Sequence, residues 1–425
     1  MPGIEAACVV PSAQGVSHRP LRVLYLHQHY SRPSGSTATR SFLNARALAA
    51  AGHAVTLACG RYQGAETGLS CAFRHGRREG APDGFAVMEF DIACGNAQSL
   101  RARSLAFLRF AAAASRLALR PGWDVVVASS TPLTVAIPAL LARRRRGVPF
   151  VFEIRDPWPE VPRALSAGGA GVPGPVLAAM GRLADAACRK AAAVVALTDG
   201  MAETAQARGA DPARLHVLPQ GADLDLFGPH VAPWRPDGVP RGAVLAVYAG
   251  AHGAANGLDQ LLDAAALLRD AGVHLLLVGE GARKPALMAR AAAEELPVSF
   301  LDPLPKARLA ALLAGADVGL LCLAPVAAFA ELSAPNKLAE GLAAGLPMIA
   351  NVPGRAARLL AEGGCGIAVP PGDAVALADA LRSLAADPAR RDAMGRAARR
   401  LAEARFDARH VARDMVRVVE MAAAR

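Results

Sequence analysis

The chain has 425 residues, of which 53% are hydrophobic and only 4% aromatic, and its formal net charge is +11. This length favours two domains over a single core, and the apolar content excludes extended disorder. Only four residues are lysines, so arginine carries nearly all of the positive charge, as is typical of a GC-rich genome. A basic balance by itself does not choose among nucleic acid, anionic lipid and phosphorylated ligands.

Cysteine usage and hydropathy predict the compartment. The seven cysteines form no CxxC pair, which favours reduced thiols in the cytoplasm over disulfides or a zinc site. The first residues show no basic stretch followed by an apolar one, so we expect no secretory leader, and no apolar run reaches the length of a membrane span. We expect a cytoplasmic protein that requires no metal and is either free or attached to the inner face of the plasma membrane.

The first half of the chain alternates apolar strands with helical patterns. After a tail at 1–20, we expect strands at 21–27, 54–59, 85–91, 123–130, 149–154, 192–197 and 215–219. Buried strands separated by helices are typical of a parallel sheet that is covered on both faces. The sequence therefore predicts a doubly wound domain over 21–227.

A segment rich in proline and glycine, 228–242, has no periodic pattern and is interpreted as an interdomain linker. The alternation then restarts, with expected strands at 243–250, 274–281, 298–302, 317–323, 347–351 and 366–370. This predicts a second, similar domain over 243–404. In such sheets ligands bind beyond the carboxyl ends of the strands, so the loops that follow strands are the candidate sites.

A glycine-containing loop follows the first strand of each domain. Gly35 lies in SRPSGST (31–37), and the second loop, AGAHGAANG, contains Gly250, Gly253 and Gly257. Small residues let backbone N–H groups approach an anion at a helix start. The alternative is an ordinary tight turn that needs glycine for steric reasons, and the second loop is not the GxGxxG fingerprint.

Charged residues follow two further strands. In GEGARK (279–284) the cation Lys284 could pair with a pyrophosphate, although solvated cations at a helix start are equally common. In EIRDPWPE (153–160) Arg155 and Asp156 suit an acid, a base or a hydrogen-bond partner. A structural Arg–Asp salt bridge is the competing account of that stretch.

The stretch SAPNKLAEGLAAGLPMIA (333–350) predicts a helix that ends at a Gly-Pro break before a buried strand. Lys337 falls near the N-terminus of this helix, where the macrodipole disfavours a cation, and Glu340 lies on the same face. An anionic ligand would explain the lysine. We therefore predict that Lys337 binds phosphate and that Glu340 accepts hydrogen bonds from ribose hydroxyls. An i,i+3 surface ion pair is the alternative.

Two arginine-rich stretches bear on partners. At 99–120 arginines are spaced among apolar residues of a predicted helix, a pattern that suits peripheral contact with an anionic membrane near a lipid-linked acceptor. A packed helix with a solvated basic face has the same pattern. The run Arg143–Arg146 is interpreted as a helix C-terminus that complements its dipole, so we expect no nucleic-acid partner.

The run APNKLAEGLAAGLPMIAN (334–351) resembles the nucleotide-binding signature of the retaining glycosyltransferases of family 4, which have the GT-B fold. Further similar motifs follow the family order: HQHYSRPSGSTATR, FEIRDPWPE, LPQGADLDLF, YAGAHGAANGLDQLLDAA, LLLVGEGARK and ADVGLLCL. Together they cover about residues 21–400. Within the family, the chain most resembles the branch that builds bacterial surface polysaccharides and includes N-acetylfucosamine-type transferases.

The resemblance implies an α/β fold with two facing doubly wound Rossmann-like domains and a deep interdomain cleft. The second domain would bind a nucleotide-diphospho-sugar, expected to be UDP-linked, and the first a lipid-linked or saccharide acceptor. The last helix, 405–425, would cross back to the first domain. The implied reaction is hexosyl or N-acetylhexosaminyl transfer with retention, in which the leaving diphosphate takes the acceptor's proton and no cofactor is required.

The resemblance also assigns residues. Glu340 would hold the ribose and Lys337 the diphosphate, and both are expected to be catalytic, with Arg155 and Asp156 as hypothetical acceptor-side residues. The implied donor site comprises Gly35, Gly250, Gly253, Asn256, Gly257, Gly279, Lys284, Pro303, Leu304, Asn336, Lys337 and Glu340.

The sequence departs from the family pattern at three places. The family's earlier glutamate is Leu332 here, with Glu331 one residue out of register; the usual Asn-Gly is Gln220-Gly221; and the Gly250 loop lacks a basic residue. These departures leave the donor-sugar geometry open. A GT-B nucleotide-sugar epimerase and a non-enzymatic two-domain binding protein are the alternative functions.

Overall fold

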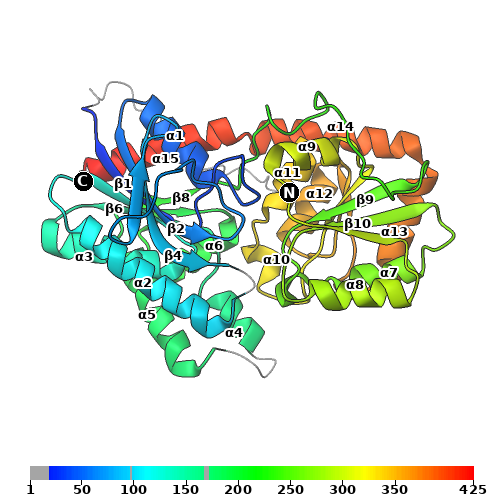
Figure 1. The fold of residues 1–425 in the computed structure, drawn as a ribbon, viewed down its shortest axis with the longest axis horizontal. Helices are drawn as coiled ribbons and strands as arrows, with labels where there is room; N and C mark the ends of the chain where they lie inside the picture. The colour runs from blue at the N-terminus through cyan, green and yellow to red at the C-terminus, as the bar shows by residue number, and fades with distance from the viewer. Residues whose placement is uncertain (1–18, 96–97, 167–171) are drawn as a thin grey trace, which may run out of the picture. The chain divides into compact units, whose positions relative to one another are not determined.

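The computed structural model describes residues 19–95, 98–166 and 172–425, so the predicted tail lies almost wholly outside the described residues. The chain divides into two compact units. The first unit consists of Met1–Arg32, Ala38–Pro219 and Arg409–Arg425, and the second of Pro33–Thr37 and Gln220–Ala408. Figure 1 shows a sheet with flanking helices in each unit.

The first unit is built on an eight-stranded sheet in the order β3-β4-β2-β1-β5-β6-β7-β8. Its strands are β1 Arg22–Leu26, β2 Ala54–Tyr62, β3 Arg77–Gly80, β4 Ala86–Cys94, β5 Val125–Ser129, β6 Phe150–Ile154, β7 Ala193–Ala196 and β8 Leu215–Val217. Its helices are α1 Arg40–Ala50, α2 Leu100–Ala118, α3 Ala136–Arg146, α4 Glu160–Ser166, α5 Gly174–Lys190, α6 Asp199–Ala207 and, from Arg409 onward, α15 Ala408–Ala423. All of the predicted strands are present and pair in parallel, and only β3 is antiparallel to its neighbour β4.

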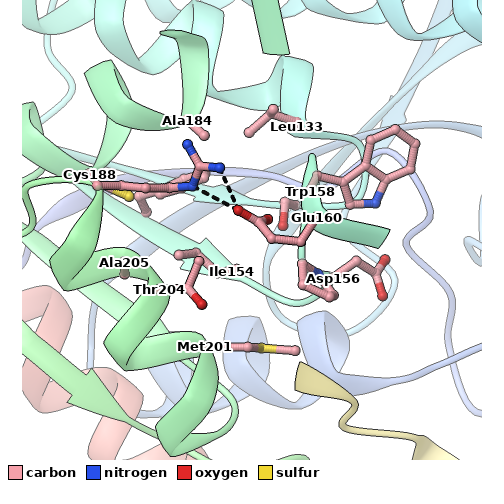
Figure 2. A pocket seen from close by; sticks show the side chains of 14 residues that line it. Leu133, Ile154, Asp156, Trp158, Glu160, Ala184, Cys188, Met201, Thr204 and Ala205 are labelled. Atoms are coloured by element: carbon pink, nitrogen blue, oxygen red, sulfur yellow. Dashed lines mark hydrogen bonds and ion pairs between the residues drawn. The ribbon is translucent and has the colours of Figure 1, made fainter. Parts of the chain in front are cut away.

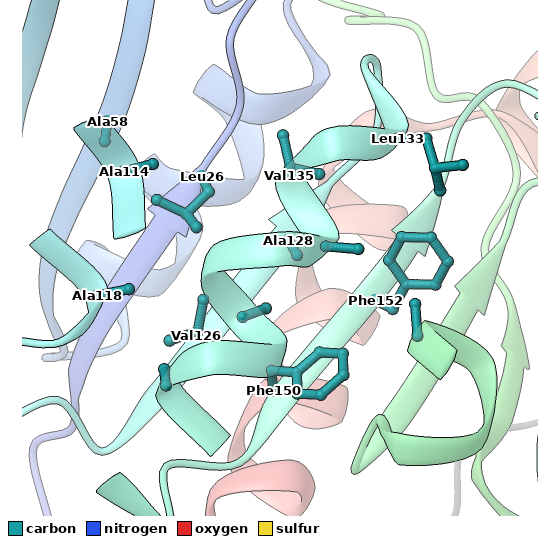
Figure 3. Packing of buried hydrophobic residues seen from close by; sticks show 14 of the residues in the cluster. Leu26, Ala58, Ala114, Ala118, Val126, Ala128, Leu133, Val135, Phe150 and Phe152 are labelled. Carbon is teal, nitrogen blue, oxygen red and sulfur yellow. The ribbon is translucent and has the colours of Figure 1, made fainter. Parts of the chain in front are cut away.

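The central strands are buried on both faces, which explains their continuous apolar runs. Leu26, Val126 and Phe150 come from neighbouring strands and pack beneath α2 and α3, where Ala114 and Ala118 are fully buried (Figure 3). Alanine at these helix positions allows the helices to approach the sheet closely. The low aromatic content is therefore compatible with a dense core.

The second unit has a six-stranded parallel sheet in the order β11-β10-β9-β12-β13-β14. The strands are β9 Val244–Ala249, β10 Val273–Val278, β11 Val298–Leu301, β12 Val318–Leu321, β13 Met348–Ala350 and β14 Gly366–Ala368. The helices are α7 Asp259–Ala266, α8 Lys284–Ala293, α9 Lys306–Ala314, α10 Phe329–Leu332, α11 Asn336–Ala343, α12 Arg355–Glu362, α13 Ala374–Ala386 and α14 Pro388–Arg405. The strand order reverses between β9 and β12, and the loop after β9 is therefore where a doubly wound sheet binds its ligand.

The segment predicted to be a linker, 228–242, contains no helix or strand, yet it belongs to the second unit. The backbone N–H of Trp234 donates to the carbonyl of Ala311 at 2.8 Å, and Arg235 pairs with Asp317 at 2.7 Å. These contacts attach the segment to that unit, so the division falls earlier, between Pro219 and Gln220.

The last helix, α15, belongs to the first unit from Arg409 onward. His53 Nε2 lies 3.1 Å from the carboxylate of Glu420, and the guanidinium of Arg425 donates to the carbonyl of Ala192 at 2.9 Å. These contacts explain why the two ends of the chain contribute to one core. Among the described residues, no helix combines the length and the hydropathy that a membrane crossing requires.

Candidate functional site

Lys337 lies in the first turn of α11 and faces the loop that follows β9. Its ammonium donates to the hydroxyl of Tyr248 at 2.8 Å and lies 3.3 Å from Oδ1 of Asn256. The same ammonium lies 4.1 Å from the Tyr248 ring centroid, within cation–π distance. A Cβ atom at Gly250 would lie 2.9 Å from Nζ of Lys337, so glycine leaves room for the ammonium. The structure thus brings together Gly250, Asn256 and Lys337, three of the residues that were predicted for the donor site.

No carboxylate of the described residues pairs with the Lys337 ammonium, whose hydrogen-bond partners are neutral. Burial lowers the pKa of Lys337 to about 8, against the opposing influence of Cys322 and Glu340. A desolvated cation without an anionic partner, in the first turn of a helix, is a site where an anion would be stabilised. The i,i+3 ion pair between Lys337 and Glu340 is absent from the described residues, so that alternative is wrong.

His252, in the loop after β9, was not identified from the sequence. Its side chain is fully buried, and neither ring nitrogen has a hydrogen-bond partner among the described residues. Burial, followed by the charge of Lys284, lowers its pKa to about 4, so the imidazole is neutral at pH 7. A histidine within a glycine-rich turn gives no periodic signal, which is why the sequence pattern did not single it out.

The two glycines of GEGARK have a steric role. Gly279 has φ +149°, and a Cβ atom there would lie 1.9 Å from the carbonyl oxygen of Gly250. Gly281 has φ +159°, and its Cβ would lie 2.5 Å from the carbonyl oxygen of His252. These glycines allow the β10 loop to pack directly on the β9 loop.

Lys284 has partners other than the predicted pyrophosphate. Its ammonium lies 2.5 Å from the carboxylate of Asp302 and 3.3 Å from the carbonyl of Leu301. The hydrogen bond from Lys284, followed by the charge of its ammonium, lowers the pKa of the Asp302 carboxyl. Lys284 is buried, whereas Asp302 and Pro303 are exposed and Leu304 is half-buried. The pair therefore orders the loop after β11 instead of offering a free cation to a ligand.

Glu340 is buried in α11 and accepts a hydrogen bond through Oε1 from the ammonium of Lys306, at the start of α9. Lys306 was also not identified from the sequence, because a lone lysine at a helix start gives no partner signal. The backbone N–H of Lys306 donates to the carbonyl of Pro33 at 3.3 Å. Pro33 begins the short loop that contains the buried Gly35 and is grouped with this unit.

Three predicted donor-site residues are explained by their local backbone. Gly257 is left-handed, with φ +57°, and a Cβ atom there would lie 2.9 Å from Cα of Ala324. Gly253 precedes a short 3₁₀ turn and has no close neighbour. Asn336 begins α11 and is half-buried.

The positions that depart from the family pattern also have local explanations. Glu331 forms a bidentate pair with Arg358 at 2.9 and 2.7 Å and is thereby turned toward α12, while Leu332 ends α10. At Gly221 a Cβ atom would lie 2.7 Å from Cα of Ala408, so close backbone packing requires glycine there.

The first unit contains a buried charge pair that the sequence did not predict. Arg40 pairs with Glu153 at 2.8 Å, and both side chains are almost fully buried. Ser129 and Tyr25 donate to the other carboxylate oxygen at 2.5 and 3.2 Å. Although burial opposes it, the charge of Arg40 helps to hold the pKa of Glu153 below its usual value. This buried network joins α1 to the central strands β1, β5 and β6.

Arg155 and Asp156 follow β6 but have different partners. The guanidinium of Arg155 lies 2.8 Å from Nε2 of His27, and Thr131 donates to Asp156. The Arg–Asp salt bridge that competed with a functional role is absent from the described residues. Burial and Arg155 lower the pKa of His27 well below its usual value, so its neutral ring accepts at Nε2 and donates from Nδ1 to Ser41, 2.8 Å away.

The pocket beside Asp156 is small. It is lined by Trp158, Glu160 and side chains of α5 and α6, and it leaves a space of about 20 Å³, room for about one water molecule. Glu160 accepts from Arg208 across it, as the dashed lines in Figure 2 show. A sugar does not fit in this space.

A larger opening of about 260 Å³ lies at the carboxyl ends of β2 and β4 and is lined in part by Tyr62, Gln63, Cys94 and Gln98. Tyr62 stacks on His29, with 4.1 Å between ring centroids. Burial, followed by the charges of Arg103 and Arg155, lowers the pKa of His29 to about 3. The opening thus combines the ring of Tyr62 and two glutamine side chains with the guanidinium of Arg61, which pairs with Asp91 at 2.6 Å.

Comparison with known proteins shows the family. Residues 35–221 match the family described as "Glycosyl transferase 4-like domain", and residues 243–387 match "Glycosyl transferases group 1". A D-inositol 3-phosphate glycosyltransferase of Kribbella flavida is 31% identical over 296 residues, which are 65% of this chain and 67% of that protein. The chain belongs to the GT-B glycosyltransferases of family 4.

A second relative of this glycosyltransferase matches a smaller part of the chain. The enzyme of the same name from Pseudarthrobacter chlorophenolicus is 34% identical over 207 residues, 46% of this chain and 48% of that one. The chain therefore spans about half the length of this relative.

Solved structures confirm the expected GT-B fold of the glycosyltransferase. Sucrose-phosphate synthase from Thermosynechococcus elongatus has a TM-score of 0.72 at 19% identity, covering 93% of this chain and 97% of that one. HepE of Anabaena, solved with UDP and glucose, has a TM-score of 0.65 at 17% identity, with 93% and 98% covered. At these identities the likeness shows the fold alone.

Proposed function

We propose that the glycosyltransferase moves a sugar from a UDP-linked nucleotide-diphospho-sugar to a lipid-linked or saccharide acceptor, with retention of anomeric configuration. The single observation that carries the donor assignment is the desolvated Lys337 ammonium, which lies in the first turn of α11 and whose hydrogen-bond partners among the described residues are neutral. A diphosphate would supply the missing negative charge. The UDP complex of HepE supports the choice of nucleotide for this fold.

The proposed biological role is the synthesis of a bacterial surface polysaccharide on the cytoplasmic side of the membrane, by a hexosyl or N-acetylhexosaminyl transferase of the N-acetylfucosamine type. The motifs quoted from the sequence support this branch. The curated relatives are named for D-inositol 3-phosphate, and a phosphorylated cyclitol is therefore the second acceptor to test.

In the proposed reaction the bond between the anomeric carbon and the β-phosphate oxygen breaks, and a bond from the acceptor oxygen forms on the same face. The acceptor's proton passes to the departing diphosphate, so no protein nucleophile is needed. Lys337 and the backbone N–H groups at the start of α11 would stabilise the charge that develops on the diphosphate. Glu340 would accept hydrogen bonds from the ribose hydroxyls.

The acceptor is proposed to bind the first unit. Arg155 and Asp156 follow β6 at the carboxyl edge of the sheet, where ligands of doubly wound domains bind. The opening of about 260 Å³ beside Tyr62 supports a saccharide acceptor, since aromatic walls suit the apolar faces of sugar rings. Arg155 would orient an acceptor hydroxyl, with the neutral His27 fixing the guanidinium.

A contact with an anionic membrane is proposed for α2. Leu100, Leu105 and Leu108 are each more than half exposed, although large apolar side chains are usually buried. Exposed arginines that form no ion pair among the described residues flank them at positions 101, 109 and 116. Apolar insertion flanked by cations suits an anionic lipid surface. Flotation with phosphatidylglycerol vesicles but not with phosphatidylcholine vesicles is the expected result, and equal recovery with both would contradict it.

The donor assignment is tested by thermal unfolding with UDP, GDP, ADP and CMP. We expect UDP to raise the unfolding temperature of the wild-type protein and to leave that of Lys337→Ala nearly unchanged. A wild-type protein that responds to none of these nucleotides would overturn the proposal. Product analysis without acceptor then separates transfer from epimerisation, since only an epimerase converts the donor sugar alone.

A further inference from the structure

Lys306 and Glu340 form a buried ion pair in the second unit. Their side chains are 6% and 12% exposed, and the ammonium donates to Oε1 of the carboxylate. The Lys306 ammonium also lies 6.0 Å from the ring centroid of Phe227. The carboxylate of Glu340 and the ring of Phe227 both lie close to this ammonium.

Stability alone does not account for this pair. Desolvating two charges offsets most of their attraction, and well-packed apolar residues are often as stable or more so. Lys306 is also the first residue of α9, where the helix dipole disfavours a cation. Both considerations favour a role in holding Glu340.

Composition favours the same view. Of 47 basic residues in the chain only four are lysines, and three of these four lie in the second unit. Lys284, Lys306 and Lys337 each occupy the first turn of a helix, α8, α9 and α11, at the carboxyl edge of its sheet. The compact ammonium of lysine and the planar guanidinium of arginine place their hydrogen-bond donors differently, so the two are not interchangeable. Lysine at these three positions therefore indicates a requirement for an ammonium group, whereas the other basic positions of the chain, apart from Lys190, use arginine.

The geometry of Glu340 leaves one oxygen available. Lys306 occupies Oε1, and Oε2 has no partner among the described residues. An ionised carboxylate is an acceptor only, with lone pairs on both oxygens. Glu340 therefore offers Oε2, in a fixed orientation, to a pair of hydroxyl donors.

We infer that Lys306 is a positioning residue that orients Glu340 toward the ribose hydroxyls of the donor, and that this pair makes the enzyme select ribonucleotides over 2′-deoxyribonucleotides. The inference rests on the proposed function, since it assumes that the second unit binds a nucleoside diphosphate. A hydrogen bond to a charged acceptor that is lost with the 2′-hydroxyl changes affinity roughly 10-fold or more.

The test is isothermal titration of the full chain with UDP and 2′-deoxy-UDP, GDP and 2′-deoxy-GDP, and ADP and 2′-deoxy-ADP. In the best-binding pair the wild-type protein should prefer the ribonucleotide about 10-fold or more. Lys306→Met keeps the aliphatic stem and should reduce this preference to within about threefold. The deoxynucleotide, which keeps the 3′-hydroxyl, should lose less affinity than the ribonucleotide. Lys190→Met, at an exposed lysine in the first unit, is the matched control and should keep the wild-type ratio.

A double-mutant cycle isolates the pair. Glu340→Gln should lose the ribose preference, and adding Lys306→Met to it should change the ratio no further, since the lysine acts through the carboxylate. If Lys306→Met does not fold, Lys306→Gln can still donate to Glu340 and should show a smaller loss of the same preference.

The possible outcomes distinguish a failure of the role inferred for Lys306 from a failure of the proposed function. A Lys306→Met protein that keeps the wild-type ratio, or that loses ribo- and deoxynucleotide affinity by the same factor, overturns the role of Lys306 and leaves the donor site intact. A wild-type protein that binds none of the six nucleotides overturns the proposed function, and the role of Lys306 with it.

Discussion

At the scale of single residues, the lowered pKa of Lys337 predicts how nucleotide affinity depends on pH. Below pH 8 Lys337 of the free enzyme is mostly protonated, and a bound diphosphate stabilises this ammonium. Above pH 8 the amine is mostly neutral and must take up a proton when the diphosphate binds, which weakens the affinity. The association constant for UDP should be nearly flat from pH 7 to 7.5 and should fall toward tenfold per unit above pH 8. Titration calorimetry over pH 7–9.5 measures this.

The control is Lys337→Arg, whose guanidinium stays charged over the whole range. Whatever its absolute affinity, its pH profile should be flat. A wild-type profile that matches it would show that the Lys337 ammonium does not contact the diphosphate.

Removing the ammonium should also slow the reaction. Lys337→Ala should lower kcat about 100-fold or more, as expected when a group that stabilises the leaving charge is lost. Initial rates with a UDP-sugar and a saturating acceptor give the value. A loss confined to KM would assign Lys337 to ground-state binding only.

The buried Arg40–Glu153 pair makes a prediction about stability. Arg40→Ala leaves a buried carboxylate without its cation and should lower the free energy of unfolding by about 3–5 kcal/mol. Asp91→Ala, which breaks the exposed Arg61–Asp91 pair, should lower it by about 1 kcal/mol or less. Urea denaturation compares the two, and equal effects would contradict a structural role for the buried network.

The sequence predicted some of these residues and missed others for a physical reason. Lys337 was found because a cation near a helix N-terminus conflicts with a local rule, and such a conflict can be read without a structure. Lys306 conflicts with the same rule, but its partner Glu340 is 34 residues further along the chain. His252 breaks no local rule. The contact between Lys306 and Glu340 depends on the order of strands in the sheet, which brings α9 beside α11. No short stretch of the sequence reveals that order.

At the scale of elements, the packing of the β10 loop on the β9 loop predicts a sensitive glycine. Gly279→Ala adds a methyl group against the carbonyl of Gly250 at a φ of +149°, and it should lower the free energy of unfolding by about 1–3 kcal/mol. Gly253→Ala, in the β9 loop and with space around it, should lower the free energy of unfolding by about 1 kcal/mol or less. Chemical denaturation checks both, and similar losses would contradict the steric explanation.

Sequence patterns predicted the parallel strands well, because buried central strands are apolar throughout. The exception is β3, whose residues RREG give no apolar signal. This strand pairs with the edge of the sheet and is formed by a hairpin-like return to β4. The segment 228–242 shows the converse: its turn-rich composition predicted the lack of regular structure but not the contacts that attach it to the second unit.

At the scale of the whole molecule, the division of the chain predicts a selective effect of truncation. Ending the chain at Ala408 removes Met415, Val418 and Val419, which are fully buried and belong to the first unit. Each such side chain contributes roughly 1.5–3 kcal/mol by burial. The first unit should therefore unfold at a lower temperature, while UDP still stabilises the second unit. Scanning calorimetry with and without UDP measures this, and equal destabilisation of both units would contradict it.

Because lysine is scarce in this protein, chemical labelling of its lysines can measure occupancy of the proposed donor site. An amine-acylating reagent has only four side-chain targets, of which Lys190 is exposed while Lys284 and Lys306 are buried in ion pairs. Lys337, with its lowered pKa, supplies a nucleophilic free amine at pH 8. Peptide mass spectrometry after brief labelling would therefore count occupied donor sites directly, since a bound diphosphate would protect one lysine and leave the reactivity of Lys190 unchanged.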